Sequence, residues 1–188
     1  MFSFHATKVF HTIEGGGIAY RDPALSTPLH YQRDYGIASP EDVEDVGGNG
    51  KMSEFQAAMG LCNLRHVEGE IESRGRAAAR YRERLSSAPG LRLLKEQPGV
   101  TPNHAYFPVF FADGNARDAA FKLLQANGVM PRKYFYPITS AFACYRGRFD
   151  PDRTPVARAL SERVLTLPMY GGLSPADVDR VCDVILGK

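Results

Sequence analysis

The hydrophobic pattern is clearest between residues 52 and 85, where apolar positions recur at helical spacing. Ser53 and Gln56 have the spacing of a capping box, which predicts a helix beginning at Ser53. We predict that this helix extends to about Leu85, with an irregularity at Gly69. Four apolar residues near its start are expected to face a core: Met52, Phe55, Met59 and Cys62.

Shorter patterns predict the remaining elements. Apolar, aromatic and β-branched runs predict strands over residues 18–20, 91–94, 106–111 and 129–136. Residues 21–50 have the composition of a loop, with a short helix expected near residues 29–35, and a helix is expected over residues 115–126, between a turn and the end signal at Asn127 and Gly128. Thr154 followed by Pro155 is typical of another helix start, and Ser174 is expected to cap the last helix.

Composition and charge are those of an ordinary soluble globular protein. The chain has 188 residues, 44% of them hydrophobic, and a formal net charge of +2, so neither nucleic acid nor a membrane surface is an expected partner. No signal peptide and no run of roughly 18 apolar residues is recognisable. Three widely spaced cysteines without a CxxC pair are typical of a reducing compartment, which predicts a cytoplasmic location. The five histidines lack metal-ligand spacing, so no metal site is predicted.

A lysine near a glycine cluster is the candidate for covalent chemistry. Lys8 precedes glycines at positions 15–17, and glycine permits close backbone approaches that other residues do not. A lysine amine that loses its proton can attack an aldehyde cofactor, and burial beside a positive charge lowers its pKa. Taken alone, Lys8 also fits a solvated surface charge, and the glycines also fit a flexible turn.

Two segments, residues 3–17 and residues 47–61, resemble the DegT/DnrJ/EryC1/StrS family of sugar aminotransferases, which depend on pyridoxal 5′-phosphate (PLP). The resemblance extends over almost the whole chain but covers roughly the C-terminal half of the family's length. It implies an α/β fold, namely the C-terminal portion of a fold-type I PLP-dependent transferase. Residues 1–52 are then expected to be a remnant of the large PLP-binding domain, residues 53–89 a long connecting helix, and residues 90–188 the C-terminal α+β small domain.

The resemblance implies roles for individual residues. Lys8 corresponds to the lysine that holds PLP covalently and shuttles a proton, and Ser3 to a serine that binds the PLP phosphate, although Ser3 also fits a turn hydroxyl. Asn49 corresponds to an asparagine that reaches the PLP phosphate of the neighbouring subunit, which implies a homodimer. Lys51 adds charge near phosphate or substrate, or is an ordinary surface lysine at a helix start. His5 is assigned no chemistry.

The implied reaction is amination of a keto group on a nucleotide-linked deoxy sugar, with dTDP as the expected nucleotide and glutamate as the expected amino donor. The product would serve amino-sugar or cell-surface polysaccharide biosynthesis, such as lipopolysaccharide. Residues 133–137 resemble a segment near the family's sugar site, and strand-packed aromatic residues explain this run equally well. The alternative is a catalytically inactive fragment, or a non-enzymatic subunit that dimerises through the helix beginning at Ser53.

The chain offers no counterpart for the aspartate that keeps the pyridine nitrogen of PLP protonated, or for the aromatic residue that stacks on it. Three explanations are open: a truncated gene model, a natural inactive fragment, or one half of an enzyme whose other half is a separate chain. The first is favoured because Met1 stands where relatives have an aliphatic strand residue such as valine, and a valine codon can be read as a start.

Overall fold

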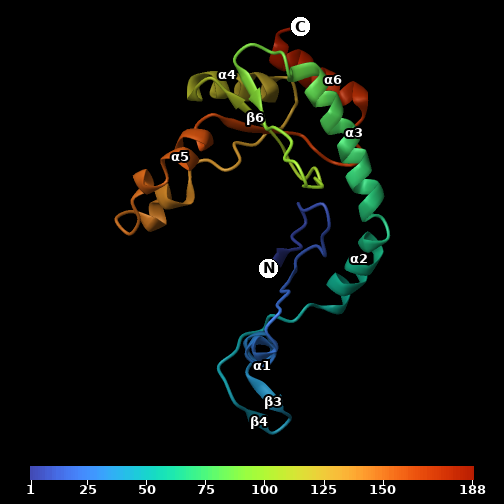
Figure 1. The fold of residues 1–188 in the computed structure, drawn as a ribbon, viewed down its shortest axis with the longest axis vertical. Helices are drawn as coiled ribbons and strands as arrows, with labels where there is room; N and C mark the ends of the chain where they lie inside the picture. The colour runs from blue at the N-terminus through green and yellow to red at the C-terminus, as the bar shows by residue number, and fades with distance from the viewer. The chain divides into compact units, whose positions relative to one another are not determined.

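The computed structural model describes residues 1–188, which form two compact units, Met1–Glu68 and Gly69–Lys188 (Figure 1). The boundary between the units falls inside a long helix that begins at Val67. No helix in either unit is both long enough and apolar enough to cross a membrane.

The first unit is built from short elements joined by loops. In chain order these are β1 (Phe2–Ser3), β2 (Gly16–Gly17), η1 (Pro23–Leu25), α1 (Ser26–Arg33), β3 (Ile37–Ser39), β4 (Asp42–Val43) and α2 (Glu54–Leu64). β1 pairs antiparallel with β2, and β3 pairs antiparallel with β4. We call residues 2–17 the lysine hairpin, because they carry Lys8, and residues 21–50 the arm.

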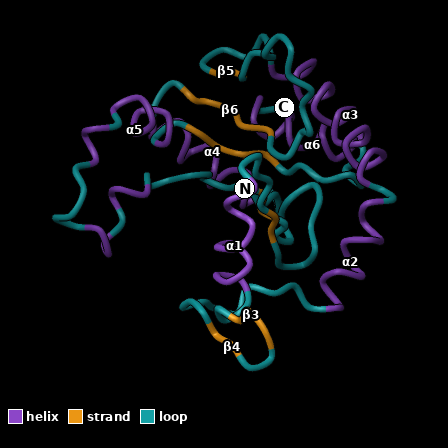
Figure 2. The backbone as a smooth tube through the Cα atoms, turned by 60° about the horizontal axis from the view of Figure 1, so that its bottom comes forward, coloured by secondary structure: helices purple, strands orange, loops and turns teal.

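The second unit combines a small sheet with helices (Figure 2). In chain order its elements are α3 (Val67–Leu85), β5 (Leu91–Leu93), β6 (Phe107–Phe111), α4 (Gly114–Ala126), η2 (Thr139–Ala141), η3 (Ala143–Tyr145), η4 (Pro151–Arg153), α5 (Pro155–Ser161), β7 (Val164–Leu167) and α6 (Pro175–Leu186). The three strands form one antiparallel sheet of order β5–β6–β7.

The core of the second unit lies on one face of this sheet. Side chains alternate along a strand, so Phe107, Val109 and Phe111 of β6 point to the same side, where α3, α4 and α6 supply the other core residues. Tyr81 of α3 stacks on Phe107 with ring centroids 4.8 Å apart. The largest fully buried side chains are Tyr81, Leu85, Leu124, Leu165, Val109, Val178 and Cys182.

Local capping explains why several helices begin where the sequence predicts. The Ser53 hydroxyl accepts a hydrogen bond from the Gln56 N–H, and the Gln56 side chain accepts one from the Ser53 N–H, so the predicted capping box is confirmed. Ser174 caps α6 by accepting from the Asp177 N–H at 3.1 Å, also as predicted. Asp113 caps α4 in the same way. The predicted helices at α1, α4 and α5 and the strands β5 and β6 are likewise confirmed, with small shifts in their bounds.

Two predicted strands are wrong. Residues 18–20 form no strand, because the pairing of the lysine hairpin ends at β2, and both Ile18 and Tyr20 are exposed. Residues 129–136 contribute only one isolated bridge, from Arg132 to β7. The third strand of the sheet is β7, all four residues of which are buried, so it takes the place beside β6 that the aromatic run was expected to occupy.

The predicted long helix is two helices, and its apolar face is not a core face. α2 ends at Leu64 and α3 begins at Val67, so the break falls at residues 65 and 66, before the irregularity expected at Gly69. Phe55 is 86% exposed, Met52 and Cys62 are also exposed, and Met59 is half-buried. The reason is that α2 meets the lysine hairpin through Gly60, its one buried residue, rather than through these apolar side chains.

Candidate functional site

The lysine hairpin holds two of the three predicted site residues close together in the chain. Ser3 lies at the end of β1, opposite Gly16 of β2. The chain then turns, and the Lys8 N–H donates to the His5 carbonyl at 2.9 Å, which leaves Lys8 half-buried within a tight loop. Phe4 N–H donates to the Gly15 carbonyl at 2.9 Å and closes the hairpin below the loop. Ser3 and Lys8 are therefore presented by one locally closed structure.

Thr12 fixes the return path of this hairpin. It is 2% exposed, its N–H donates to the Phe4 carbonyl at 2.9 Å, and its hydroxyl donates to the Glu14 carbonyl at 2.9 Å. A Cβ on Gly15 would lie only 2.2 Å from the Thr12 hydroxyl oxygen, so the first glycine of the triplet is needed for close packing. The glycine cluster is thus part of a packed turn and not a flexible one.

α2 packs against the lysine hairpin. A Cβ on Gly60 would lie 2.8 Å from Thr12 Cγ2, so the helix backbone approaches the hairpin as closely as a glycine allows. One turn later, Asn63 Nδ2 donates to the His11 carbonyl at 2.9 Å. The capping box at Ser53 sets where α2 begins, and it therefore also sets which residues of α2 face the hairpin.

His5 is held by hydrogen bonds within the hairpin. Its Nε2 lies 3.3 Å from Glu14 Oε1, and its Nδ1 lies 2.9 Å from the Thr7 hydroxyl oxygen. Both ring nitrogens therefore have partners close in sequence. This arrangement agrees with the expectation that His5 is a hydrogen-bonded histidine without an assigned chemical role.

Asn49 lies in the arm, where a backbone bridge pairs it with Asp34. Lys51 contacts two neighbouring residues of the arm. Its Nζ lies 2.5 Å from Asp34 Oδ1 and 4.1 Å from the centre of the Tyr35 ring. The hydrogen bond from Lys51 holds the pKa of the Asp34 carboxyl below its usual range. Lys51 is thus engaged within its own arm.

The structure does not bring Asn49 together with Ser3 and Lys8. In Figure 1 the arm, with α1, β3 and β4, extends away from the blue segment that begins the chain. The arm has its own internal packing, in which the Tyr31 hydroxyl donates to Glu44 at 2.8 Å and a Cβ on Gly47 would lie 2.0 Å from the Tyr31 carbonyl oxygen. Asn49 itself is exposed. A role for Asn49 at the phosphate of a second copy is compatible with this separation and stays a prediction.

The aromatic run of residues 133–137 is irregular and partly exposed. Lys133 Nζ lies 2.6 Å from Asp118 Oδ1, and this contact lowers the pKa of the Asp118 carboxyl. Tyr136 is stacked by the guanidinium of Arg117, whose Cζ lies 4.6 Å from the ring centre. Phe135 and Tyr136 both remain exposed. The side chains therefore do not pack as a strand, and their exposed faces leave a role at a sugar site open.

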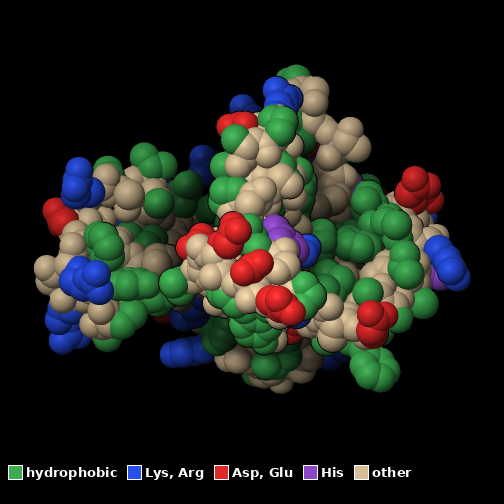
Figure 3. All heavy atoms as spheres, turned by 90° about the horizontal axis from the view of Figure 1, so that it is seen from below, with side chains coloured by type: hydrophobic (Ala, Val, Ile, Leu, Met, Phe, Trp, Pro, Cys, Tyr) green, Lys and Arg blue, Asp and Glu red, His purple; other side chains and the backbone are tan.

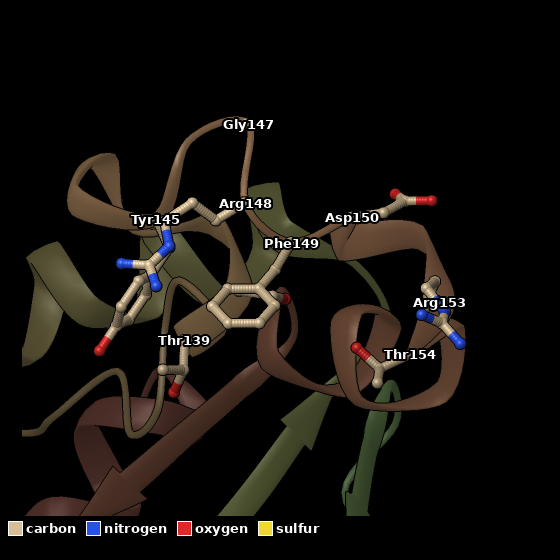
Figure 4. A pocket seen from close by; sticks show the side chains of 9 residues that line it. Thr139, Tyr145, Gly147, Arg148, Phe149, Asp150, Arg153 and Thr154 are labelled. Atoms are coloured by element: carbon tan, nitrogen blue, oxygen red, sulfur yellow. The ribbon is translucent and has the colours of Figure 1, made fainter.

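Sequence reasoning missed a recess in the segment between η2 and α5 (Figure 4). It has a volume of about 1070 Å³, and its lining includes Tyr145, Arg148, Phe149 and Arg153. The available signal was the close interleaving of arginines with aromatic residues over residues 145–153. That signal was overlooked because the segment has no helical or strand periodicity.

The donor groups of the chain fit PLP in part. Lys8 supplies a primary amine for covalent attachment of an aldehyde, and Ser3 supplies a hydroxyl that can donate to a phosphate oxygen. Asn49 supplies an amide that suits the phosphate of a PLP bound by a second copy, as the resemblance implies. These are attachment and phosphate groups, and they come from elements that the hairpin and the arm hold in defined positions.

Comparison with known proteins identifies relatives along nearly the full chain. The DegT/DnrJ/EryC1/StrS aminotransferase family matches residues 1–186. A dTDP-4-amino-4,6-dideoxy-D-glucose transaminase from Escherichia coli is 37% identical over 179 residues, which cover 93% of this chain and 48% of the relative. A similar transaminase from Shigella dysenteriae is 31% identical over 187 residues, covering 98% of this chain and 51% of the relative.

Solved structures agree in fold. A crystal structure of DesI with its TDP-sugar product superposes with a TM-score of 0.88 at 34% identity, covering 98% of this chain and 47% of that one. The fold is therefore α/β and matches the C-terminal portion of fold-type I transferases, as predicted. The chain spans about half the length of the relatives that it matches.

Proposed function

Because the chain belongs to the DegT/DnrJ/EryC1/StrS aminotransferase family, we propose that it serves a PLP-dependent sugar aminotransferase. The proposed reaction converts a keto group of a nucleotide-linked deoxy sugar to an amine. The dTDP-sugar names of the relatives support dTDP as the nucleotide. Glutamate is the proposed donor, and amino-sugar biosynthesis for cell-surface polysaccharide is the proposed setting.

The observation that carries this proposal is the lysine hairpin. Aminotransferases of this family depend on PLP, and the family match includes the whole hairpin. The hairpin places Lys8 and Ser3 on one closed turn, braced by Thr12 and by Gly60 of α2. A turn of this kind holds an amine and a hydroxyl in fixed relation, as covalent attachment and phosphate binding require.

PLP, when bound, supplies an aldehyde for amino-group exchange and a ring that accepts electrons. Lys8 would hold the cofactor covalently through its Nζ, and the same amine would supply the base that moves a proton at the reacting carbon. The Ser3 hydroxyl would donate to the phosphate and so hold the phosphate group of the cofactor in place. Asn49 acts at the phosphate bound by a second copy, which makes the proposed enzyme a homodimer.

The first experiment adds PLP to the purified chain and records its visible absorbance before and after borohydride reduction. We expect a protein-bound band that reduction makes permanent and that Lys8→Ala abolishes. Lys122→Ala is the matched control, because Lys122 is an exposed lysine of α4, and this variant should keep the band. Mass spectrometry of the reduced protein should place the added mass on Lys8.

Failure takes two forms in this experiment. A band that survives in Lys8→Ala would assign the attachment to another amine, and the absence of any band would remove PLP chemistry from this chain. With the band in place, glutamate-dependent amination of a dTDP-linked keto sugar tests the substrate separately.

A non-enzymatic role is the second candidate, and the exposed apolar residues of α2 favour it. Phe55, Leu61 and Leu64 are all exposed, and their spacing places them on different sides of this helix. Exposed apolar side chains gathered on one helix are typical of a segment that another protein covers. Specific attachment of PLP to Lys8 would favour the enzymatic role, and its absence would favour the interaction role.

A further inference from the structure

α2 contacts the part of the lysine hairpin that directly follows the turn carrying the lysine (Figure 1). A Cβ on Gly60 would lie 2.8 Å from Thr12 Cγ2 and 3.9 Å from Phe10 Cζ, so the helix backbone passes close to both residues. Asn63 lies three positions further along the same side of α2, and its Nδ2 donates to the His11 carbonyl at 2.9 Å. Three consecutive residues of the hairpin are therefore held by one side of α2.

Ile13, the next residue, has a strained backbone. Its φ is +68°, in the left-handed region, and a β-branched residue rarely adopts this conformation. The Ile13 side chain is 47% exposed, so its own packing contributes little to holding it there. A residue keeps such a conformation where the surrounding structure determines it. Here the Thr12 hydroxyl donates to the Glu14 carbonyl at 2.9 Å, across Ile13, and Asn63 holds His11 on the preceding side.

The segment held by α2 also closes the turn that carries Lys8. The Thr12 N–H donates to the Phe4 carbonyl at 2.9 Å, across the base of this turn. The rings of Phe4 and Phe10 meet edge to face there, with centroids 5.0 Å apart. Within the turn, the Lys8 N–H donates to the His5 carbonyl at 2.9 Å. A shift of the segment after the turn would therefore change where Lys8 lies relative to β1.

The contact at Asn63 differs in kind from the contact at Gly60. A hydrogen bond requires its donor and acceptor to meet at a set distance and angle, so it fixes the position of the His11 carbonyl along α2. The close approach at Gly60 brings carbon atoms together without such a directional requirement. Asn63 is half-buried, so its hydrogen bond is partly shielded from water. Asn63 is therefore the contact that can set the conformation of the hairpin.

We propose that Asn63 is a positioning residue for Lys8. Its amide holds the His11 carbonyl, keeps Ile13 in its strained conformation and so keeps the turn with Lys8 in one orientation. Covalent attachment of a cofactor needs an amine held in a fixed place, and a supporting contact from outside the site supplies this. The proposal rests on the proposed function, in that PLP is the cofactor that Lys8 holds.

The test compares Asn63→Leu, which removes the amide at similar size, with Asn63→Gln, which keeps it. PLP is added to the full chain of each variant, and the visible circular dichroism of the protein-bound band is divided by its absorbance. This ratio reports how uniformly the bound PLP is oriented, and a loss of stability alone does not change it in protein that remains folded. We expect a lower ratio in Asn63→Leu and a ratio near that of the unchanged protein in Asn63→Gln.

Amide hydrogen exchange gives a second readout, without PLP. Asn63→Leu should speed exchange at the Lys8 and Thr12 amides by about tenfold, the size of effect that the loss of one hydrogen bond produces. In Ile13→Gly, glycine adopts a positive φ without strain, so adding Asn63→Leu to this variant should speed exchange by a smaller factor.

Cys62→Ser is the matched control, because Cys62 is an exposed neighbour of Asn63 on α2. This variant should leave both the dichroism ratio and the exchange of the hairpin unchanged. Urea denaturation of every variant establishes that each is folded under the conditions of the two measurements.

Three outcomes would overturn the proposal: either readout unchanged in Asn63→Leu, equal effects of Cys62→Ser and Asn63→Leu, or an effect of Asn63→Leu on exchange that Ile13→Gly does not diminish. If Lys8 takes PLP with the same ratio in every variant, the proposed function stands and Asn63 has no positioning role. If no lysine of the unchanged protein takes PLP, the proposed function fails, and the exchange measurements still decide whether Asn63 holds the turn.

Discussion

At the scale of single residues, Glu70 of α3 holds the loop that follows β7. Glu70 Oε1 accepts from the Gly171 N–H at 3.0 Å and from Arg74 Nε at 2.7 Å. Arg74 in turn donates to the Met169 carbonyl at 3.0 Å, and the Ser73 hydroxyl donates to the Gly171 carbonyl. Three polar contacts therefore hold one short loop against α3, and the Arg74–Glu70 pair orients two of the groups that make them.

Gly171→Ala should destabilise the second unit. A Cβ at this position would lie 1.9 Å from Glu70 Oε2, so Glu70 must move and give up its hydrogen bonds. We expect a loss of about 1–2 kcal/mol in the free energy of unfolding, measured by urea denaturation. Gly172→Ala is the control, because a Cβ there meets only the Tyr170 ring at an ordinary 3.9 Å. Equal stability of the two variants would contradict this account.

Asp179 should make stability depend on acid pH. Hydrogen bonds from Arg80 and then Arg84 hold the pKa of its carboxyl below the usual value of about 3.9. A pKa that is lower in the folded state gives stability above the unfolded pKa, and this stability is lost as pH falls through the folded pKa.

Between about pH 5 and pH 3, the unchanged protein should therefore lose more stability than Asp179→Asn in urea denaturation. Glu68→Gln is the control, since Glu68 is an exposed carboxylate that makes no ion pair. Parallel pH profiles for the protein and Asp179→Asn would remove Asp179 as a cause.

Residue-scale features were predictable only where their partners are close in sequence. Ser53 and Gln56 are three positions apart, so the capping box could be read directly from the chain. The bond between Glu70 and Gly171 joins positions 101 residues apart, and no local pattern indicates it. Lys8 was found through a dense motif around it, and not through any property of a lone lysine.

At the scale of elements, two helical glycines should respond oppositely to alanine. Gly60→Ala places a Cβ 2.8 Å from Thr12 Cγ2, where α2 meets the lysine hairpin, so we expect a loss of about 1 kcal/mol from overpacking. Gly69→Ala in α3 meets nothing within 4 Å, and the higher helix propensity of alanine should add roughly 0.5–1 kcal/mol.

Amide hydrogen exchange of α2 and α3 measures both effects locally. Gly60→Ala should speed exchange in α2 and in the hairpin, and Gly69→Ala should slow exchange in α3. Slower exchange in α2 on Gly60→Ala would mean that helix propensity outweighs the contact with Thr12.

The element predictions failed where tertiary packing decides between similar segments. The aromatic run at residues 129–136 and the aliphatic run of β7 both fit a strand, and pairing with β6 selected β7. The prediction of a core face on α2 failed for a different reason. Helical spacing shows which residues share a face, but it does not show which face other residues cover. Gly60 determines which side of α2 packs on the lysine hairpin, since only a glycine allows the helix backbone to approach Thr12 so closely.

At the scale of the whole molecule, the two motif segments, residues 3–17 and 47–61, predicted the family and the fold, although both segments lie in the first unit. These segments did not predict which unit carries each candidate site. The lysine hairpin and the arm belong to the first unit, and the arginine-lined recess belongs to the second.

The exposed apolar residues of α2 make self-association of the purified chain the expected behaviour. Phe55, Leu61 and Leu64 expose apolar side chains to water on different sides of α2, and Figure 3 shows apolar atoms at the right, where this helix lies. Burying such a surface gains about 25 cal/mol for each Å², so association should grow with concentration. Replacing Phe55 and Leu61 together by serine should reduce the mass measured by light scattering toward that of a monomer. Val156→Ser, on α5, removes an equally exposed but isolated apolar residue and should change nothing. A chain that stays monomeric at every concentration would show that the exposed apolar residues of α2 do not drive association. An equal response to the double serine variant and to Val156→Ser would show the same.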